Sequence, residues 1–208
     1  MTTRRYNSPT RAAASLETRH RLVAVGAELL RGEKGPHLSM EAVARAAGVT
    51  RLTVYKQFGS RRALLEAVFD DRAAAGGLTR LYEAMAIEDP REAVIQVIDI
   101  FCAFWASDAA LGRIHDAGAA DDELRQALLE RNERRRQLFD ALLRRTPSVA
   151  DERRRDMVDL LYTLTSLPTW RSLKTGREDA AVRDLIQAAA AMLLGPFPEK
   201  SRLVAKMP

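Results

Sequence analysis

Apolar residues recur at helical spacing through most of the chain, and no long stretch alternates apolar and polar residues as a half-buried strand would. In the last predicted helix, from Asp179 to Leu194, one stripe carries the apolar residues Val182, Leu185, Ile186, Ala189, Met192 and Leu193. Leu, Ala, Arg and Glu, which are good helix formers, dominate the composition. The pattern therefore predicts an all-α fold.

The same pattern sets the expected elements. Residues 1–15 are polar, basic and aperiodic, which predicts a flexible basic arm. Beyond the arm, helices are predicted over 16–31, from 40 to just before Gly48, over 51–58, from 61 to a weak point at Gly76-Gly77, and over 90–106, 110–117, 121–145, 151–174 and 179–194. We expect the helix over 121–145 to be closed by Pro147, and that over 151–174 to be bent or broken at Pro168.

Three hydroxyl residues precede the short helices near the N-terminus. Ser39, Thr50 and Ser60 each stand where a side-chain oxygen can cap a helix, and Gly48 ends the first of these helices. Two short helices joined by a glycine-containing turn, with a longer helix before and after, form a helix-turn-helix unit. This unit places the segment RLTVYKQF, residues 51–58, on its second helix.

Charge is unevenly distributed along the chain. Residues 1–62 hold 12 Lys and Arg against 4 Asp and Glu, a balance of +8, whereas residues 63–208 hold 21 against 24, a balance of −3. A basic N-terminal third ahead of a mildly acidic body indicates a polyanion-binding module joined to something else.

The segment 51–58 has the division of faces that a DNA-reading helix needs. Val54 and Phe58 are four residues apart and are predicted to face inward. Arg51, Leu52, Thr53, Tyr55 and Lys56 would then point outward. Arg51 could pair with guanine, and Leu52 or the Thr53 methyl group could touch a thymine methyl group.

From Thr18 to Phe69 the chain resembles the N-terminal DNA-binding domain of TetR-family transcriptional regulators. The resemblance is carried by TRHRLVAVGAELLRGEKG, SMEAVARAAGVT and TVYKQFGSRRALLEAV. It implies a dimer on a palindromic operator, usually a repressor that a small ligand releases. Residue by residue, it implies phosphate contacts by Ser39, Thr53, Tyr55 and Arg61, and base contacts by or near Thr50, Arg51, Leu52 and Lys56. Independently of the resemblance, Ser60 can donate to a phosphate, because it lies at a helix N-terminus where free backbone amides favour an anion. Leu52, Gln57 and Gly59 depart from the residues common in the family, which leaves the operator sequence open.

The resemblance also implies the layout of the chain: a helix-turn-helix domain over 16–62 and a helical effector-binding and dimerisation domain over 63–208. The last two long helices would form the homodimer interface, with apolar stripes that include Met157, Leu160, Leu161 and Leu164. Candidate ligand contacts lie among the central helices: Gln96, Asp99, Phe101, Phe104, Trp105, Leu111, His115, Asn132, Arg135, Phe139, Tyr162, Thr165, Ser166 and Trp170. Two interpretations stay open for them, because aromatic residues at this spacing also build cores and Arg135 lies in a charged run, RNERRRQ, typical of a solvated face.

Other classes of function find little support in the sequence. The three histidines, His20, His37 and His115, have no metal-ligand spacing, and no Ser or Cys lies in a nucleophile motif. We therefore expect no enzyme, no metal and no cofactor. The single cysteine, Cys102, lies in an apolar run and is predicted to be buried. No apolar run approaches membrane-spanning length, so we expect a cytoplasmic protein. A ligand-independent regulator or activator, and a helical interaction module without DNA binding, remain alternatives.

Overall fold

The computed structural model describes residues 9–32, 38–146 and 149–195 of the 208-residue chain, and all regular structure in these ranges is helical. This confirms the predicted all-α fold. In chain order the helices are α1 (Pro9–Arg31), α2 (Met40–Ala46), α3 (Arg51–Phe58), α4 (Arg61–Ala75), the 3-10 turn η1 (Leu78–Arg80), α5 (Leu81–Ala86), α6 (Pro90–Ser107), α7 (Ala110–Ala117), α8 (Asp122–Leu143), α9 (Asp151–Leu164), α10 (Leu167–Lys174) and α11 (Asp179–Leu194).

The chain divides into two compact units, each with its own apolar core. Unit 1 consists of residues 1–77 and 107–131, and unit 2 of residues 78–106 and 132–208. Unit 1 therefore contains α1–α4, α7 and the first part of α8.

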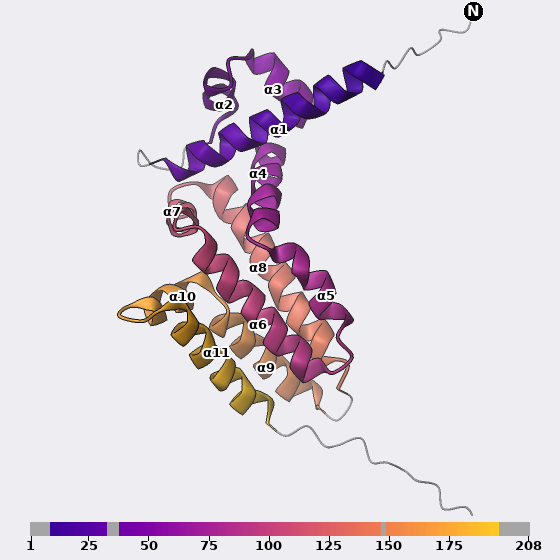
Figure 1. Cartoon of the computed structure of the whole chain (residues 1–208), viewed down its shortest axis with the longest axis vertical. Coiled ribbons are helices and arrows are strands. Elements are labelled where there is room, and N and C mark those ends of the chain that lie inside the picture. Colours follow the sequence, from indigo (N-terminus) through magenta and orange to yellow (C-terminus); the bar gives the residue numbers. More distant parts are fainter. Residues whose placement is uncertain (1–8, 33–37, 147–148, 196–208) are drawn as a thin grey trace, which may run out of the picture. The chain divides into compact units, whose positions relative to one another are not determined.

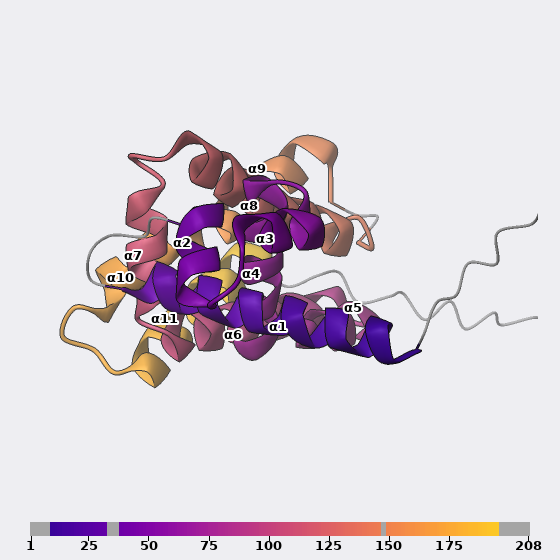
Figure 2. The ribbon, with the colours of Figure 1, turned by 90° about the horizontal axis from the view of Figure 1, so that it is seen from above.

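In unit 1, α1 packs against α2, α4 and α7, and α2 packs against α3. Figures 1 and 2 show α2 and α3 side by side next to α1. The core includes Leu22 and Leu30 of α1 and Leu64 of α4, all fully buried. Gly26 allows α1 to approach α4 closely, because a Cβ atom at this position would lie 2.8 Å from Cγ2 of Val68.

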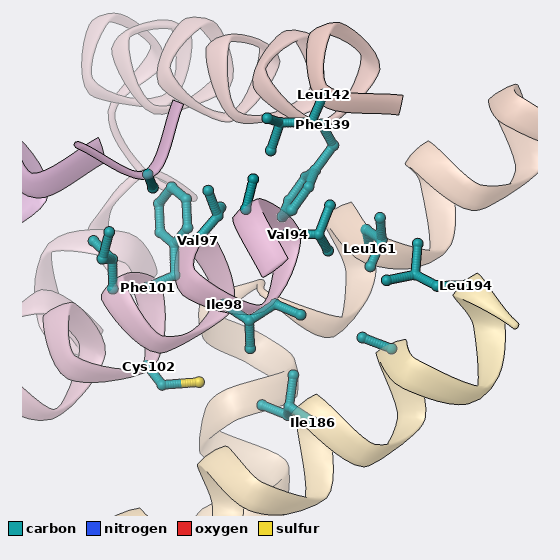
Figure 3. Close-up of a cluster of buried hydrophobic side chains, with 14 of the residues drawn as sticks. Val94, Val97, Ile98, Phe101, Cys102, Phe139, Leu142, Leu161, Ile186 and Leu194 are labelled. Carbon is teal, nitrogen blue, oxygen red and sulfur yellow. The ribbon is translucent and has the colours of Figure 1, made fainter. Parts of the chain in front are cut away.

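In unit 2, α6 is the most apolar helix and supplies the largest share of the core. Its side chains meet Phe139 and Leu142 of α8, Leu161 of α9 and Ile186 of α11 (Figure 3). Cys102 lies in this core, which confirms its predicted burial. Within the described ranges no single helix is long and apolar enough to cross a membrane; α6 and α7 reach that composition only when counted together across the break between them.

Two expected boundaries were wrong. α1 begins at Pro9, seven residues before the predicted start, because Pro suits the first turn of a helix and an Ala-rich run follows it. Of the predicted flexible arm, residues 1–8 lie outside the described residues, as does Pro147. The helix predicted over 151–174 breaks at Thr165 and Ser166 and not at Pro168. The Ser166 side chain caps α10, and Pro168 lies in the first turn of α10.

Candidate functional site

The exposed face of α3 is the centre of the candidate nucleic-acid interface. Val54 and Phe58 are buried, as predicted, and hold the helix to unit 1. Arg51, Leu52, Tyr55 and Lys56 are exposed, and Leu52, with 62% of its surface accessible, is one of the most exposed large apolar residues described. Thr53 is half-buried. The helix thus has one anchored side and one free side.

The three predicted helix caps are confirmed. The Oγ atoms of Ser39 and Ser60 accept hydrogen bonds from the amides of Ala42 and Ala63, at 3.0 and 3.1 Å. Thr50 Oγ1 accepts a hydrogen bond from the Thr53 amide at 3.2 Å, and the Thr50 and Thr53 hydroxyl groups are hydrogen-bonded to each other at 2.9 Å. A hydroxyl oxygen that accepts in a cap still carries its proton, so Ser39 and Ser60 can also donate to a phosphate.

The turns around α3 depend on glycine. Gly48 and Gly59 have φ values of 66° and 75°, a region that residues with a Cβ atom rarely adopt. Nothing lies within 4 Å of a Cβ atom built on either residue, so the backbone conformation, and not crowding, favours glycine here.

Arg51 and Tyr55 form a pair on the exposed face. Arg51 Nη2 donates to the Tyr55 hydroxyl at 3.2 Å, and the guanidinium lies 5.3 Å from the centre of the Tyr55 ring. The hydrogen bond from Arg51 to Tyr55 raises the pKa of Arg51. One turn of helix therefore presents a positioned cation beside a hydroxyl group.

Contacts from α1 hold the end of α3 and were missed in the sequence. Arg19 Nη1 donates to the Gln57 carbonyl oxygen at 2.6 Å, and its guanidinium lies 4.4 Å from the centre of the Phe58 ring. Gln57 Nε2 donates to Ser15 Oγ at 3.0 Å. Arg19 and Gln57 are 38 residues apart, so no local pattern links them.

Arg61 differs from the other predicted phosphate contacts, because its guanidinium is already engaged. Nε donates to the Leu38 carbonyl oxygen at 2.5 Å, Nη1 donates to Glu123 Oε2 at 2.5 Å, and Nη2 pairs with Asp121. Burial raises the pKa of Asp121, but the hydrogen bonds from Arg61 and from the Leu124 amide outweigh it, so the net pKa is lowered. We call Arg61, Asp121 and Glu123 the Arg61 clasp. In this conformation Arg61 ties α4 to the start of α8 and offers no free cation.

The fourteen candidate ligand contacts are dispersed between the two units. Leu111 and His115 belong to unit 1. The His115 side chain is 40% exposed, and its Nδ1 lies 3.5 Å from Oδ1 of Asp116. In unit 2, Phe139 and Trp170 are part of the core, and Asp99 pairs with Arg80 and Arg183. Gln96 and Asn132 are half-buried, and Phe104 lies against Trp105 at a ring-centre distance of 4.7 Å.

The remaining candidates of unit 2 gather around Arg135. Its guanidinium lies 5.4 Å from the Phe101 ring centre, 6.0 Å from that of Trp105 and 4.7 Å from that of Tyr162. Arg135 Nη1 and Trp105 Nε1 both donate to the Thr165 carbonyl oxygen, at 3.2 and 2.9 Å, and Ser166 follows directly. Arg135 is only 5% exposed, so its interpretation as part of a solvated face was wrong. The missed signal was its position four residues before Phe139 and seven before Leu142, on the buried face of α8.

No group of three or more His, Cys, Asp or Glu side chains in the described ranges could hold a metal ion. Unit 1 also has an open hollow at its surface, lined by Ala24, Val25, Glu28, Leu29, Ala46 and Arg72, which contains none of the predicted site residues.

The capped helix pair with its exposed basic α3 has the arrangement of a helix-turn-helix motif. Residues 22–68 match the family model of bacterial regulatory proteins of the tetR family. No curated protein matches the chain. The matched segment contains α2 and α3 with parts of α1 and α4, so this part of the chain is similar to bacterial regulatory proteins of the tetR family.

Several solved structures share the fold. NalD, the secondary repressor of the MexAB-OprM multidrug efflux pump in Pseudomonas aeruginosa, is 25% identical with a TM-score of 0.54, over 88% of this chain and 94% of NalD. The fatty acid degradation regulator FadR from Bacillus halodurans is 17% identical with a TM-score of 0.58, over 92% and 97% of the two chains. A transcriptional regulator of Aquifex aeolicus VF5 is 14% identical with a TM-score of 0.57, over 85% and 99%.

Proposed function

We propose that the protein is a homodimeric repressor that binds a palindromic operator in the bacterial cytoplasm and is released by a small apolar or aromatic ligand. The observation that carries the DNA-binding part is the exposed face of α3, on which Arg51, Leu52, Tyr55 and Lys56 stand on a helix anchored by Val54 and Phe58. Repression is suggested by similarity, since NalD is described as a repressor.

Within this proposal the contacts fall into two groups. Thr50, Arg51, Leu52 and Lys56 lie at or near bases, with Arg51 suited to guanine and Leu52 to a thymine methyl group. The second group grips phosphates and consists of Ser39, Thr53, Tyr55 and Ser60. Arg61 is left out of the second group because the Arg61 clasp already occupies its donors.

A dimer through the last two long helices is supported by apolar residues left uncovered in one chain. On α11 the exposed residues Ala181, Leu185, Ala188 and Met192 follow one another at spacings of four, three and four, which places them on one stripe. Met192 is 78% exposed, and Leu160 on α9 is half-exposed. A second copy would bury this stripe, and two α3 helices about 34–36 Å apart would read two half-sites.

The test is operator binding by fluorescence anisotropy with a fragment of the gene's own promoter, repeated over a range of salt concentrations. We expect log K to fall steeply as log salt rises, because phosphate contacts release counterions. A flat dependence would remove the DNA-binding proposal. Arg51→Ala should cost about 1–3 kcal/mol and relax preference at one base position of a single-substitution panel. Tyr55→Phe should weaken binding to all panel members alike.

A further inference from the structure

Arg135 is a buried cation that pairs with no carboxylate in the described part of the chain. It lies on α8 with 5% of its surface accessible, enclosed by the rings of Phe101, Trp105 and Tyr162. Phe101 extends from α6 toward α8 (Figure 3), and Tyr162 lies on α9, so the cluster joins three helices of unit 2.

The hydrogen bonds of Arg135 are incomplete. A guanidinium has five N–H donors. Nη1 donates to the Thr165 carbonyl oxygen at 3.2 Å, but Nε is buried and has no partner. The Thr165 oxygen is shared with Trp105 Nε1, which lies closer at 2.9 Å. Arg135 therefore has donor capacity left over inside an aromatic cluster.

Its neighbours on α8 show that this lack of an anion is particular to Arg135. Arg131 pairs with Glu66 and Asp70, at 2.6 and 2.8 Å, and Arg136 pairs with Asp159. Among the described residues, no carboxylate lies within ion-pair distance of Arg135.

Burying a charge is costly unless the charge is paired. Burial lowers the pKa of Arg135, and its charge interaction and hydrogen bond with the Tyr162 side chain offset only part of that effect. A guanidinium nevertheless keeps its proton at neutral pH. The aromatic faces attract the cation but cannot accept its N–H bonds in the way an oxyanion does. A carboxylate could accept two parallel N–H bonds from the guanidinium and neutralise its charge.

We infer that Arg135 anchors the carboxylate of a small monocarboxylic acid whose aromatic or aliphatic body packs against Phe101, Trp105 and Tyr162. One negative charge balances the single buried positive charge, whereas a dianionic phosphate would leave a net negative charge in an apolar setting. This inference rests on the proposed function, in which a small ligand controls operator binding, and it specifies the chemical class of that ligand.

The experiment is titration of the full chain with monocarboxylates from acetate to dodecanoate, together with benzoate and phenylacetate. Benzamide serves as the neutral match for benzoate, and inorganic phosphate as the dianion. Binding is followed by calorimetry and by Trp105 fluorescence in a Trp170→Phe background. We expect one or more carboxylates to bind, and benzamide and phosphate to bind at least about tenfold more weakly, since hydrogen bonds to charged groups contribute that much.

Two variants separate an anchor from a structural cation. Arg135→Met should reduce carboxylate affinity about tenfold to a hundredfold. Arg134→Met, at the exposed neighbouring position on α8, should leave it unchanged. Without ligand, Arg135→Met should have a Tm equal to or above that of the wild type, because an unpaired buried charge is removed.

Three results would overturn the inference: no carboxylate of the series binds, carboxylates bind Arg135→Met as tightly as the wild type, or Arg135→Met lowers the ligand-free Tm by several degrees. Operator release is scored separately. If a carboxylate binds through Arg135 but leaves operator affinity unchanged, the anchor stands and ligand-controlled repression fails.

Discussion

Replacing Arg61 by Met should change the stability of this protein and not the salt dependence of its DNA binding. The guanidinium donates to the Leu38 carbonyl oxygen and to Glu123, and it pairs with Asp121. Met keeps much of the aliphatic stem but removes all of these bonds. The family resemblance implies instead that Arg61 contacts a phosphate, in which case its loss would change the salt dependence of DNA binding.

The size of the effect follows from the burial of the pair. The Arg61 and Asp121 side chains are 25% and 21% exposed, between fully exposed pairs worth up to about 1 kcal/mol and buried pairs whose disruption costs about 3–5 kcal/mol. The Leu38 carbonyl group also loses its partner. We expect the free energy of unfolding to fall by about 2 kcal/mol, which lowers Tm by about 4–8 °C in a chain of this size.

Lowering the pH should reduce the difference in stability between the wild type and Arg61→Met. The folded-state pKa of Asp121 is lowered, so the clasp stabilises the fold above the carboxyl group's unfolded pKa of about 4 and loses that effect as the pH falls through the folded value. The gap in Tm between wild type and Arg61→Met should therefore be full at pH 7 and should narrow below about pH 4.

Thermal melts measure the stability, and operator titrations over a salt series measure the phosphate contacts. Lys56→Met is the matched comparison, because Lys56 is an exposed cation on the face of α3 that is proposed to meet the DNA. Removing this one charge should reduce the slope of log K against log salt by up to about 0.9. Arg61→Met should leave that slope unchanged. If Arg61→Met reduced the slope as much as Lys56→Met and left Tm unchanged, the Arg61 clasp would be refuted and Arg61 would return to the predicted phosphate contacts.

Three further predictions address packing and assembly. Gly26→Ala should lower stability by about 1 kcal/mol despite its better helix propensity, because the new methyl group lies 2.8 Å from Val68 Cγ2; adding Val68→Ala should reverse the steric part. Cys102 should react with a thiol reagent only after unfolding, since burial raises the pKa of its thiol to about 12; fast labelling of the native protein would contradict this. Met192→Glu, on the proposed dimer stripe of α11, should shift the sedimentation coefficient toward that of the monomer. Tyr82→Glu, at a similarly exposed residue outside that stripe, should leave it unchanged.

Much of the helix-turn-helix unit could be predicted because its signals are local. The caps at Ser39, Thr50 and Ser60 act within three residues of themselves, and the four-residue spacing of Val54 and Phe58 defines one face of a single helix. These features depend on backbone geometry that each short segment carries with it. Which bases the exposed face reads is not tested by the structure and remains a prediction.

The arginines show what the sequence alone could not determine. Arg61 and Arg135 both lie beside other arginines in the sequence, yet the first is bound to carboxylates 60 and 62 residues away and the second is enclosed by aromatic rings from α6 and α9. The chain by itself determined which segments are helical, where they are capped and which faces are apolar, because those depend on short-range spacing and backbone hydrogen bonds. Only the tertiary structure decided which cations of the described segments pair with carboxylates, and that Arg135 is buried without such a partner among them, because charge pairing depends on distances between segments remote in sequence.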